Sequence, residues 1–331
     1  MPRNRNKTAD QKTLETLKKH LKGGETLIVG ISGGPDSVFL LHMLLKFTPK
    51  LNIVVAHINH ALRGIEAELD TDFVKNLAKK HKIPFKHTKI DIATLSRAKK
   101  KSVEETGRDI RYKFFNKLYK DYKADYILTA HHLDDNLETI LLNFIRGSNL
   151  QGITGIQETS LYQKTRNVLR PLLNISKQEI VEYLQDKHIL YRIDATNEDR
   201  DIPRNFLRHE VIPKLKELNP SLPKTVLRNS KNFKEIQALL EKEAKAWIRG
   251  NKISSQTFDL KSLQTLPAPI QKEILIQIYK EAEGDTKNIE SIHLDEVLSI
   301  INKNVGNKKK KLNKYTVEIK KGTLIMKPCQ S

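Results

Sequence analysis

Residues Glu25–Leu45 read ETLIVGISGGPDSVFLLHMLL and carry three structural signals in a row. The apolar run Leu27–Ile31 predicts a buried strand, and apolar residues at helical spacing from Val38 onward predict a helix. Between the two lies the turn Ser32–Ser37. A glycine turn between a strand and a helix N-terminus gathers free N–H groups and the positive helix end, so it predicts an anion site, usually for phosphate. The turn contains no lysine and lacks the Walker A spacing.

Strand and helix signals alternate along the first part of the chain. Further strands are predicted at 51–57, 84–90 and 125–130, and helices at 8–22, 66–82, 104–120, 134–146 and 176–187. The last helix opens with a capping box formed by Ser176 and Glu179. Such alternation predicts an α/β fold built on a doubly wound parallel sheet. Ligands of these sheets bind at the carboxyl ends of the strands, so motifs that follow strands should meet at one edge.

The alternation stops at a proline-rich stretch that contains Pro213, Pro220 and Pro223. We therefore expect a first domain over residues 1–215 and a second over 216–331. The second domain is predicted to be mainly helical and basic, and to close with a hairpin. The predicted elements are helices at 225–249, 268–283 and 292–304, and strands at 315–319 and 323–327.

The chain has 331 residues and a formal net charge of +20. A charge of this size attracts polyanions, of which nucleic acid is the commonest for such a protein. Charge for solubility or a lysine-rich proteome remains the alternative explanation. The run Lys308, Lys309, Lys310 and Lys311 favours contact with a phosphate backbone over a solvated loop, because the whole chain is basic.

Cys329 is the single cysteine, so the chain can form neither an internal disulfide nor a cysteine cluster for zinc or iron–sulfur ligation. The N-terminus lacks the apolar core of a signal peptide. No apolar run approaches the roughly 18–20 residues that span a bilayer. We expect a cytoplasmic protein with no membrane partner.

Polar residues follow the second predicted strand, where the segment from His57 to Arg63 reads HINHALR. A lone histidine at such a place is usually structural. Here Arg63 is suited to phosphate, while Asn59 and the histidines can hydrogen-bond to a base or ribose. If the phosphate at this edge belongs to a nucleotide, we predict that His57, Asn59 and Arg63 contact that nucleotide.

Acidic residues follow the fourth predicted strand, in the segment His131–Thr139. On the helix that begins there, Asp135 and Glu138 are three residues apart and share a face. Compensation of the helix dipole explains one acid easily, but it explains the set of Asp134, Asp135 and Glu138 less well. Magnesium takes one or two carboxylates plus phosphate oxygens, so Asp36 and Asp135 are the predicted Mg²⁺ ligands. Glu138 remains for a cationic substrate such as an amine.

Taken together, these segments resemble two nested groups of proteins. The turn SGGPDS resembles the PP-loop of the ATP pyrophosphatase superfamily, whose fold is adenine nucleotide alpha hydrolase-like. The whole set resembles the tRNA(Ile)-lysidine synthetase family. The matching segments are His57–Arg63, His131–Thr139, Arg146-Gly147-Ser148 with Gly152 and Gly155, Arg170-Pro171-Leu172-Leu173, Asp194-Ala195-Thr196-Asn197, and Arg204-Asn205 with Arg208. The agreement covers about residues 25–220, and the chain's length suggests a short form.

This resemblance implies an ATP-dependent ligase that modifies isoleucine tRNA with a CAU anticodon. The carbon-2 oxygen of the first anticodon cytidine attacks the α-phosphate of ATP and releases pyrophosphate. The ε-amine of free L-lysine then displaces AMP to form lysidine. Some members of the family pair, so a homodimer is a further expectation.

The resemblance also implies roles for individual residues. Arg111 matches an arginine that contacts ATP phosphates, although this chain reads Glu104-Glu105-Thr106-Gly107-Arg108 where the family often has E-E-A-A-R. The implied catalytic residues are Asp36, Arg111, Asp135 and Glu138. ATP is assigned to Ser32, Gly33, Gly34, Pro35, Asp36, Ser37, His57, Asn59 and Arg63. Lysine is assigned to Glu138 and His132, and tRNA to Arg146, Arg170, Arg204, Arg208 and Lys308–Lys311.

Three other functions agree less well with the sequence. Sulfur transfer to tRNA by related PP-loop enzymes needs a nucleophilic cysteine or an iron–sulfur cluster, which Cys329 cannot supply. A small-molecule amide synthetase would need neither the net charge nor the His57–Arg63 segment. A non-catalytic RNA-binding protein would have no reason to keep carboxylates beside a phosphate loop.

Overall fold

The structure is a computed structural model. It describes residues 7–61, 64–162, 166–193, 202–254, 256–283, 289–303 and 308–329. The chain forms two compact units, one of residues 1–136 and 156–218 and the other of residues 137–155 and 219–331. The second unit thus takes in a segment, 137–155, that precedes the predicted domain boundary at 215. The division into functional domains at that boundary stays a prediction.

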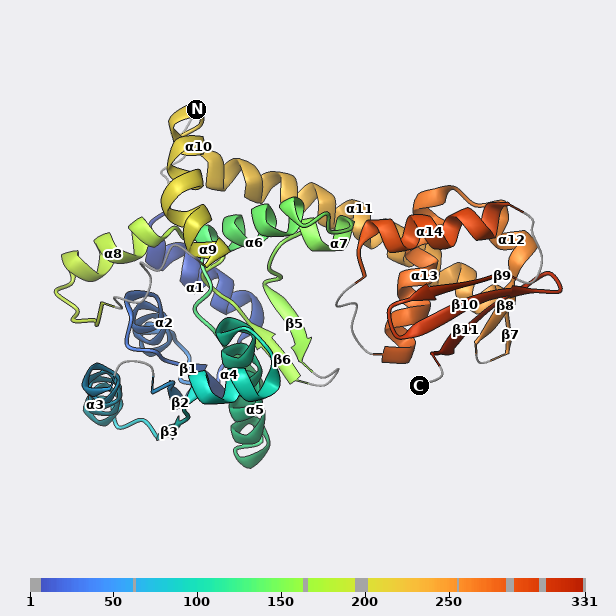
Figure 1. Cartoon of the computed structure of the whole chain (residues 1–331). Helices are drawn as coiled ribbons and strands as arrows, with labels where there is room; N and C mark the ends of the chain where they lie inside the picture. The colour runs from blue at the N-terminus through green and yellow to red at the C-terminus, as the bar shows by residue number, and fades with distance from the viewer. Residues whose placement is uncertain are drawn as a thin grey trace. The chain divides into compact units, whose positions relative to one another are not determined.

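The first unit is built on a six-stranded sheet (Figure 1). Its strands are β1 (Thr26–Gly30), β2 (Asn52–Asn59), β3 (Phe85–Lys89), β4 (Tyr126–Leu128), β5 (Thr159–Tyr162) and β6 (Arg166–Leu169). Their order is β3-β2-β1-β4-β6-β5, and every pairing is parallel except that of β5 with β6. The predicted doubly wound parallel sheet is confirmed, and β5 adds an antiparallel edge strand.

Helices cover both faces of this sheet, because successive side chains of a strand point to opposite faces. The helices of the first unit are α1 (Ala9–His20), α2 (Pro35–Lys46), α3 (Ile65–Lys80), α4 (Ile92–Lys99), α5 (Val103–Asp121), α8 (Lys177–Asp186), α9 (Pro203–Phe206), η2 (Leu207–Val211) and α10 (Ile212–Leu218). Leu27 and Val29 of β1 share a core with residues of α1, α2, α3 and α8. Ile28, between them, belongs to the core on the other face, with Tyr112, Phe115 and Leu118 of α5.

Helix α6 (Leu133–Ile145) begins in the first unit and continues into the second. The second unit also contains α7 (Leu150–Ile153), α11 (Leu222–Asn251), α12 (Leu260–Gln264), α13 (Ala268–Glu283) and α14 (Ser291–Asn302). Its antiparallel sheet has the order β7-β8-β11-β10-β9, from β7 (Lys252–Ser254), β8 (Thr257–Asp259), β9 (Lys308–Leu312), β10 (Tyr315–Lys320) and β11 (Thr323–Pro328). The predicted hairpin is present as β10 and β11. The other three strands were not predicted.

Membrane-spanning helices are absent from the part of the chain that the structure describes, since no helix there is both long and apolar enough.

Gly30 offers a test of how closely α5 packs on the sheet. A Cβ at Gly30 would lie 2.6 Å from Cζ of Phe115. We expect Gly30→Ala to destabilise the protein by about 1–3 kcal/mol, because overpacking a filled core forces strain. Urea unfolding followed by circular dichroism measures the change.

Gly250 in α11 is the matched control, since a Cβ there meets nothing within 4 Å. Gly250→Ala should stabilise the protein by up to about 1 kcal/mol, because alanine restricts the unfolded chain. Phe115→Leu should recover part of the stability that Gly30→Ala loses. Unchanged stability of Gly30→Ala would contradict the close packing.

Candidate active site at the β1–β4 edge

The motifs predicted from the sequence converge where β1 and β4 lie side by side. The two strands pair in parallel, with Val29 opposite Leu128. The sheet order changes direction between them, since β2 and β3 lie beyond β1 while β6 and β5 lie beyond β4. Such a switch point leaves a crevice at the carboxyl ends of the strands, where ligands of open α/β sheets bind. The PP-loop follows β1, and the His131–Asp135 turn follows β4.

The PP-loop winds around the hydroxyl of Ser37. Ser37 Oγ accepts hydrogen bonds from the backbone N–H groups of Ser32 and Gly33, each at 3.2 Å, and donates one to the carbonyl of Gly34 at 2.9 Å. Gly33 has φ +96°, in the region that favours glycine. Gly34 caps α2, and Pro35 and Asp36 open its first turn. Ser37 therefore holds the loop in its turn, and the positive end of α2 is the part of the loop that suits an anion.

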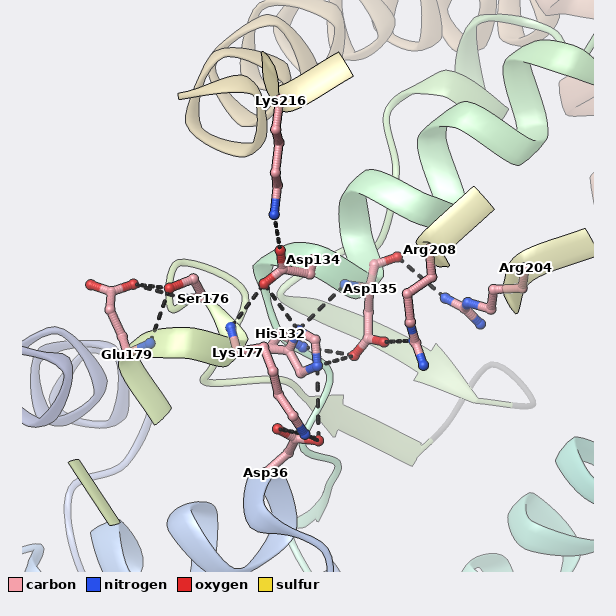
Figure 2. Close-up of polar contacts among 10 residues, drawn as sticks. All are labelled: Asp36, His132, Asp134, Asp135, Ser176, Lys177, Glu179, Arg204, Arg208 and Lys216. Atoms are coloured by element: carbon pink, nitrogen blue, oxygen red, sulfur yellow. Dashed lines mark hydrogen bonds and ion pairs between the residues drawn. The ribbon is translucent and has the colours of Figure 1, made fainter. Parts of the chain in front are cut away.

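Asp36 and Asp135 lie on either side of His132 (Figure 2). His132 Nε2 is 3.8 Å from Asp36 Oδ2 and 3.5 Å from Asp135 Oδ2. The backbone N–H of His132 also donates to Asp135 Oδ2 at 3.0 Å. His132 is 5% exposed. Two carboxylates that are 99 residues apart in the sequence thus approach the same imidazole nitrogen.

Two arginines from the segment after α8 surround Asp135. Arg208 Nη2 lies 3.6 Å from Asp135 Oδ1, and Arg204 Nη2 donates to the Asp135 carbonyl at 3.2 Å. Burial raises the pKa of Asp135, but the charges of His132, His131 and Arg204 and the His132 N–H bond outweigh it, so the pKa is lowered overall. Asp135 is therefore ionised at neutral pH, as a cation ligand must be.

Asp134 lies on the other side of His132, with Oδ2 3.8 Å from Nδ1 of His132, and it has a positioning role. Its Oδ2 accepts the backbone N–H of Lys177 at 2.8 Å, and its Oδ1 lies 3.3 Å from Lys216 Nζ. The adjacent residues Asp134 and Asp135, at the start of α6, therefore have different roles. Asp134 holds the start of α8, and Asp135 faces Asp36 across His132.

A second group of basic residues lies near Asp135. Burial lowers the pKa of Arg111, and so does the positive charge of Arg108. An arginine nevertheless stays charged at neutral pH. Burial also lowers the pKa of His131 to about 3 and that of His60 to about 4, with positive arginines adding to both shifts. Both histidines are therefore neutral at physiological pH, and they can accept hydrogen bonds without adding positive charge.

Glu138 lies on α6 and is 1% exposed. It follows Asp135 by three residues, so helix geometry gives the two carboxylates the same side of α6. Glu138 also has contacts within the protein. A buried carboxylate is stabilised by a cationic or hydrogen-bonding neighbour, because it has lost its contact with water. A protonated amine is such a neighbour.

His57 and Asn59 form hydrogen bonds within the protein at this edge of the sheet. His57 is 3% exposed, and its ring nitrogens lie 2.9 Å from the Ile31 carbonyl and 3.2 Å from Thr71 Oγ1. Asn59 bonds to the backbone of Ala61 and Ala67. Both residues thus tie β2 to its neighbours, and their contact with ATP stays a prediction. Arg63 and Asp194–Asn197, which the sequence also singled out, lie outside the described residues.

The arginines and lysines predicted to contact tRNA fall into different environments. Arg146 and three of the four lysines, Lys308, Lys309 and Lys311, are exposed. Arg170 is buried at 6% exposure, and it donates to the Gln157 carbonyl at 2.8 Å and to Ser160 Oγ at 3.0 Å. Arg204 and Arg208 lie at Asp135, as described above. Arg170 thus makes structural contacts, and Arg204 and Arg208 lie at the candidate active site, while contact of these arginines with tRNA stays a prediction.

Lys177 is the residue of this site that the sequence analysis missed. Its Nζ lies 2.8 Å from both carboxylate oxygens of Asp36 (Figure 2). Lys177 follows Ser176, the capping residue that the sequence did identify. No local pattern marks Lys177, because its partner is 141 residues away.

Asp36 and Asp135 fit the magnesium site that the sequence predicts. Among the residues that the structure describes, no group of three or more His, Cys, Asp or Glu is arranged to hold a metal ion. Mg²⁺ needs only one or two carboxylates when phosphate oxygens and water complete its shell. The Asp36 carboxylate pairs with the positively charged ammonium group of Lys177. A carboxylate at this position therefore suits a cation that is bound to phosphate.

Comparison with known proteins identifies the class of this site. Residues 6–215 match the PP-loop domain family. A tRNA(Ile)-lysidine synthase of Porphyromonas gingivalis is 35% identical over 257 residues, which cover 78% of this chain and 55% of that protein. One of Clostridium tetani is 32% identical over 315 residues, which cover 91% of this chain and 67% of that protein.

Among solved structures, the U34-tRNA thiolase NcsA of Methanococcus maripaludis aligns with a TM-score of 0.56 at 18% identity. The alignment covers 69% of this chain and 78% of the thiolase. At that identity the likeness shows the fold alone, and it agrees with the sheet described above.

The fold, the loop after β1 and the family match together show that this chain is a PP-loop protein. Proteins of this class use ATP. Within this class, the chain belongs to the tRNA(Ile)-lysidine synthase family. It spans about half of the Porphyromonas gingivalis relative and two thirds of the Clostridium tetani relative.

Arg170 provides a test that separates a structural from a tRNA-binding role. Arg170→Met removes the donors to Gln157 and Ser160 but keeps most of the buried volume. We expect a loss of about 2–4 kcal/mol in urea unfolding, because the hydrogen bonds of a buried side chain are lost.

Arg146→Met is the control, and it should change stability by no more than about 0.5 kcal/mol, because the side chain is exposed. Full stability of Arg170→Met, with a weaker salt dependence of tRNA binding, would instead return Arg170 to the tRNA contacts.

Proposed function

We propose that this chain ligates free L-lysine to carbon-2 of the cytidine at the first anticodon position of isoleucine tRNA with a CAU anticodon. The reaction proceeds through a tRNA adenylate and yields lysidine, AMP and pyrophosphate. The observation that carries this proposal is the arrangement of a PP-loop beside the Asp135–Glu138 helix, in a chain 32–35% identical to tRNA(Ile)-lysidine synthases.

In the first step, the carbon-2 oxygen of the cytidine attacks the α-phosphorus of ATP, and the bond to pyrophosphate breaks. The N-terminus of α2, which Gly34 caps, is suited to the negative phosphates. Arg111, Arg204 and Arg208 add positive charge near Asp135. Preorganised charge of this kind stabilises the transition state of phosphoryl transfer.

Asp36 and Asp135 are the residues that would hold Mg²⁺. When bound, the ion supplies charge neutralisation and polarises the phosphate oxygens. The lowered pKa of Asp135, to which Arg204 and the backbone N–H of His132 contribute, supports this assignment.

In the second step, the ε-amine of lysine attacks carbon-2 and AMP leaves, because an adenylate is a far better leaving group than an unactivated oxygen. Glu138, buried on α6, is suited to orient the ammonium group and to receive its proton. His132, six residues before Glu138 in the chain, is the second residue assigned to lysine.

Separate changes in the two carboxylates test this division of labour. Asp36→Asn should reduce tRNA-dependent pyrophosphate release by about 100-fold, because it removes charge beside the phosphates. Glu138→Gln should raise the KM for lysine by about tenfold or more, because an ion pair is lost, while pyrophosphate release changes little. Labelled pyrophosphate and labelled lysine report the two steps separately.

Asp186→Asn is the control, because Asp186 is exposed and pairs only with its neighbour Lys187 among the described residues. A normal KM for lysine in Glu138→Gln would remove that residue from the lysine site.

The tRNA surface of the second unit is proposed to lie on one face of its sheet. Side chains alternate along β9, so Lys309 and Lys311 share one face, while Lys308 and Lys310 share the other with the buried Leu312. Lys310 also pairs with Glu296 of α14 at 3.3 Å. The outer face of β10 and β11 adds Lys320 and Lys327, both exposed. Four lysines thus surround Glu318, which makes contacts of 3.6 Å with Lys309 and 3.9 Å with Lys327.

Paired substitutions on β9 test this surface. Lys309→Ala with Lys311→Ala should reduce the slope of log Kd against log salt by about 2, because each phosphate contact contributes about 0.7–0.9. Lys308→Ala with Lys310→Ala removes the same charge from the other face and should change the slope less. Equal slopes for the two pairs would contradict a sheet-face surface.

Lysine incorporation tests the function as a whole. Label should enter isoleucine tRNA with a CAU anticodon but not methionine tRNA, with one AMP and one pyrophosphate released per lysine. Pyrophosphate release without label would favour another PP-loop adenylating reaction. Neither label nor ATP turnover would favour a non-catalytic RNA-binding protein.

A further inference from the structure

The PP-loop of this chain lacks a feature that other phosphate loops contain. In the Walker A motif, a lysine within the loop reaches the β- and γ-phosphates. No lysine occurs between Ile31 and Leu45. The fold instead brings one from elsewhere, since Lys177 at the start of α8 meets Asp36 at the start of α2.

The ammonium group of Lys177 lies close to the mouth of the loop. Its Nζ is 2.8 Å from Oδ1 and 2.8 Å from Oδ2 of Asp36, and Asp36 comes two residues after Gly34 (Figure 2). The Lys177 side chain is 43% exposed and that of Asp36 is 26% exposed. The pair is thus open to solvent and to a ligand, and an ion pair in such a setting contributes little to stability.

The backbone of Lys177 is held firmly although its side chain is not buried. Its N–H donates to Asp134 Oδ2 at 2.8 Å. The preceding residue, Ser176, forms a capping box with Glu179, and Glu179 pairs with Lys12 of α1. A fixed backbone with a flexible four-carbon side chain lets the ammonium group move by a few ångströms without any change of fold.

Binding of Mg²⁺ with ATP would place a second cation at Asp36. The ammonium group of Lys177 and the metal ion repel each other, so they cannot share the two carboxylate oxygens. The triphosphate brings negative charge to the same loop, and it is the nearest new partner for a displaced ammonium group.

We propose that Lys177 is the phosphate-binding lysine of this PP-loop. It pairs with Asp36 in the nucleotide-free protein and transfers to the non-bridging oxygens of the ATP β- and γ-phosphates. This inference rests on the proposed use of ATP at this site, but it does not depend on the identity of the tRNA or of the nucleophile.

Calorimetric titration of the full chain with ATP and with AMP, both in Mg²⁺, tests the inference. Lys177→Ala should weaken ATP binding by about tenfold or more and AMP binding by less than about twofold, because AMP lacks the β- and γ-phosphates. Lys177→Arg should recover most of the ATP affinity, since it keeps the charge. Lys177→Gln, which keeps the length of the side chain, replaces Lys177→Ala if that variant does not fold.

Lys187→Ala is the matched control, because it removes an exposed lysine ion pair, with Asp186, at the other end of α8. Both its ATP and its AMP affinities should match those of the unaltered protein. Unchanged or tighter ATP binding by Lys177→Ala would overturn the proposal, since Lys177 would then only neutralise Asp36. Equal losses for ATP and AMP would also overturn it, because they would indicate a distorted site.

Failure of the proposed function would look different. The unaltered protein would then bind ATP, and Lys177→Ala would bind it weakly, yet no lysine would enter isoleucine tRNA.

Discussion

The candidate active site depends on the parallel pairing of β1 with β4. Ile28 pairs with Ile127, and both are fully buried, so the register of these strands is set by the core. A slip by one residue would turn the apolar side chains to the wrong face of the sheet. Because parallel strands end at the same edge, this register brings the turn after β1 next to the turn after β4. Asp36 and Asp135 are neighbours for that reason alone.

Balanced charge is the second property of this edge. The carboxylates of Asp36, Asp134 and Asp135 each lie near cations. These cations are Lys177, Lys216, Arg208 and, when protonated, His132. Ion pairs that are partly exposed are weak one by one, so they can exchange partners when a polyphosphate and a metal ion arrive. Such a site can bind a highly charged substrate without rearranging its backbone.

The sequence predicted the long, periodic elements well and the short, polar ones poorly. Helix α13 was predicted with the observed bounds, and α11 within three residues at each end. Strand β9 reads KKKKL, a composition that gives no strand signal. It becomes a strand because Val317 and its neighbours on β10 supply a partner. Lysines also suit such an edge, since they discourage pairing with another chain.

The same distinction applies to the functional residues. Local order in the sequence determined the PP-loop, the acidic face of α6 and the capping box at Ser176, because these signals depend on neighbours a few residues apart. Tertiary structure decided that His57 supports the fold and that Lys177 lies on Asp36. These contacts join residues 26 and 141 positions apart, and only the packing of the sheet and its helices brings them together.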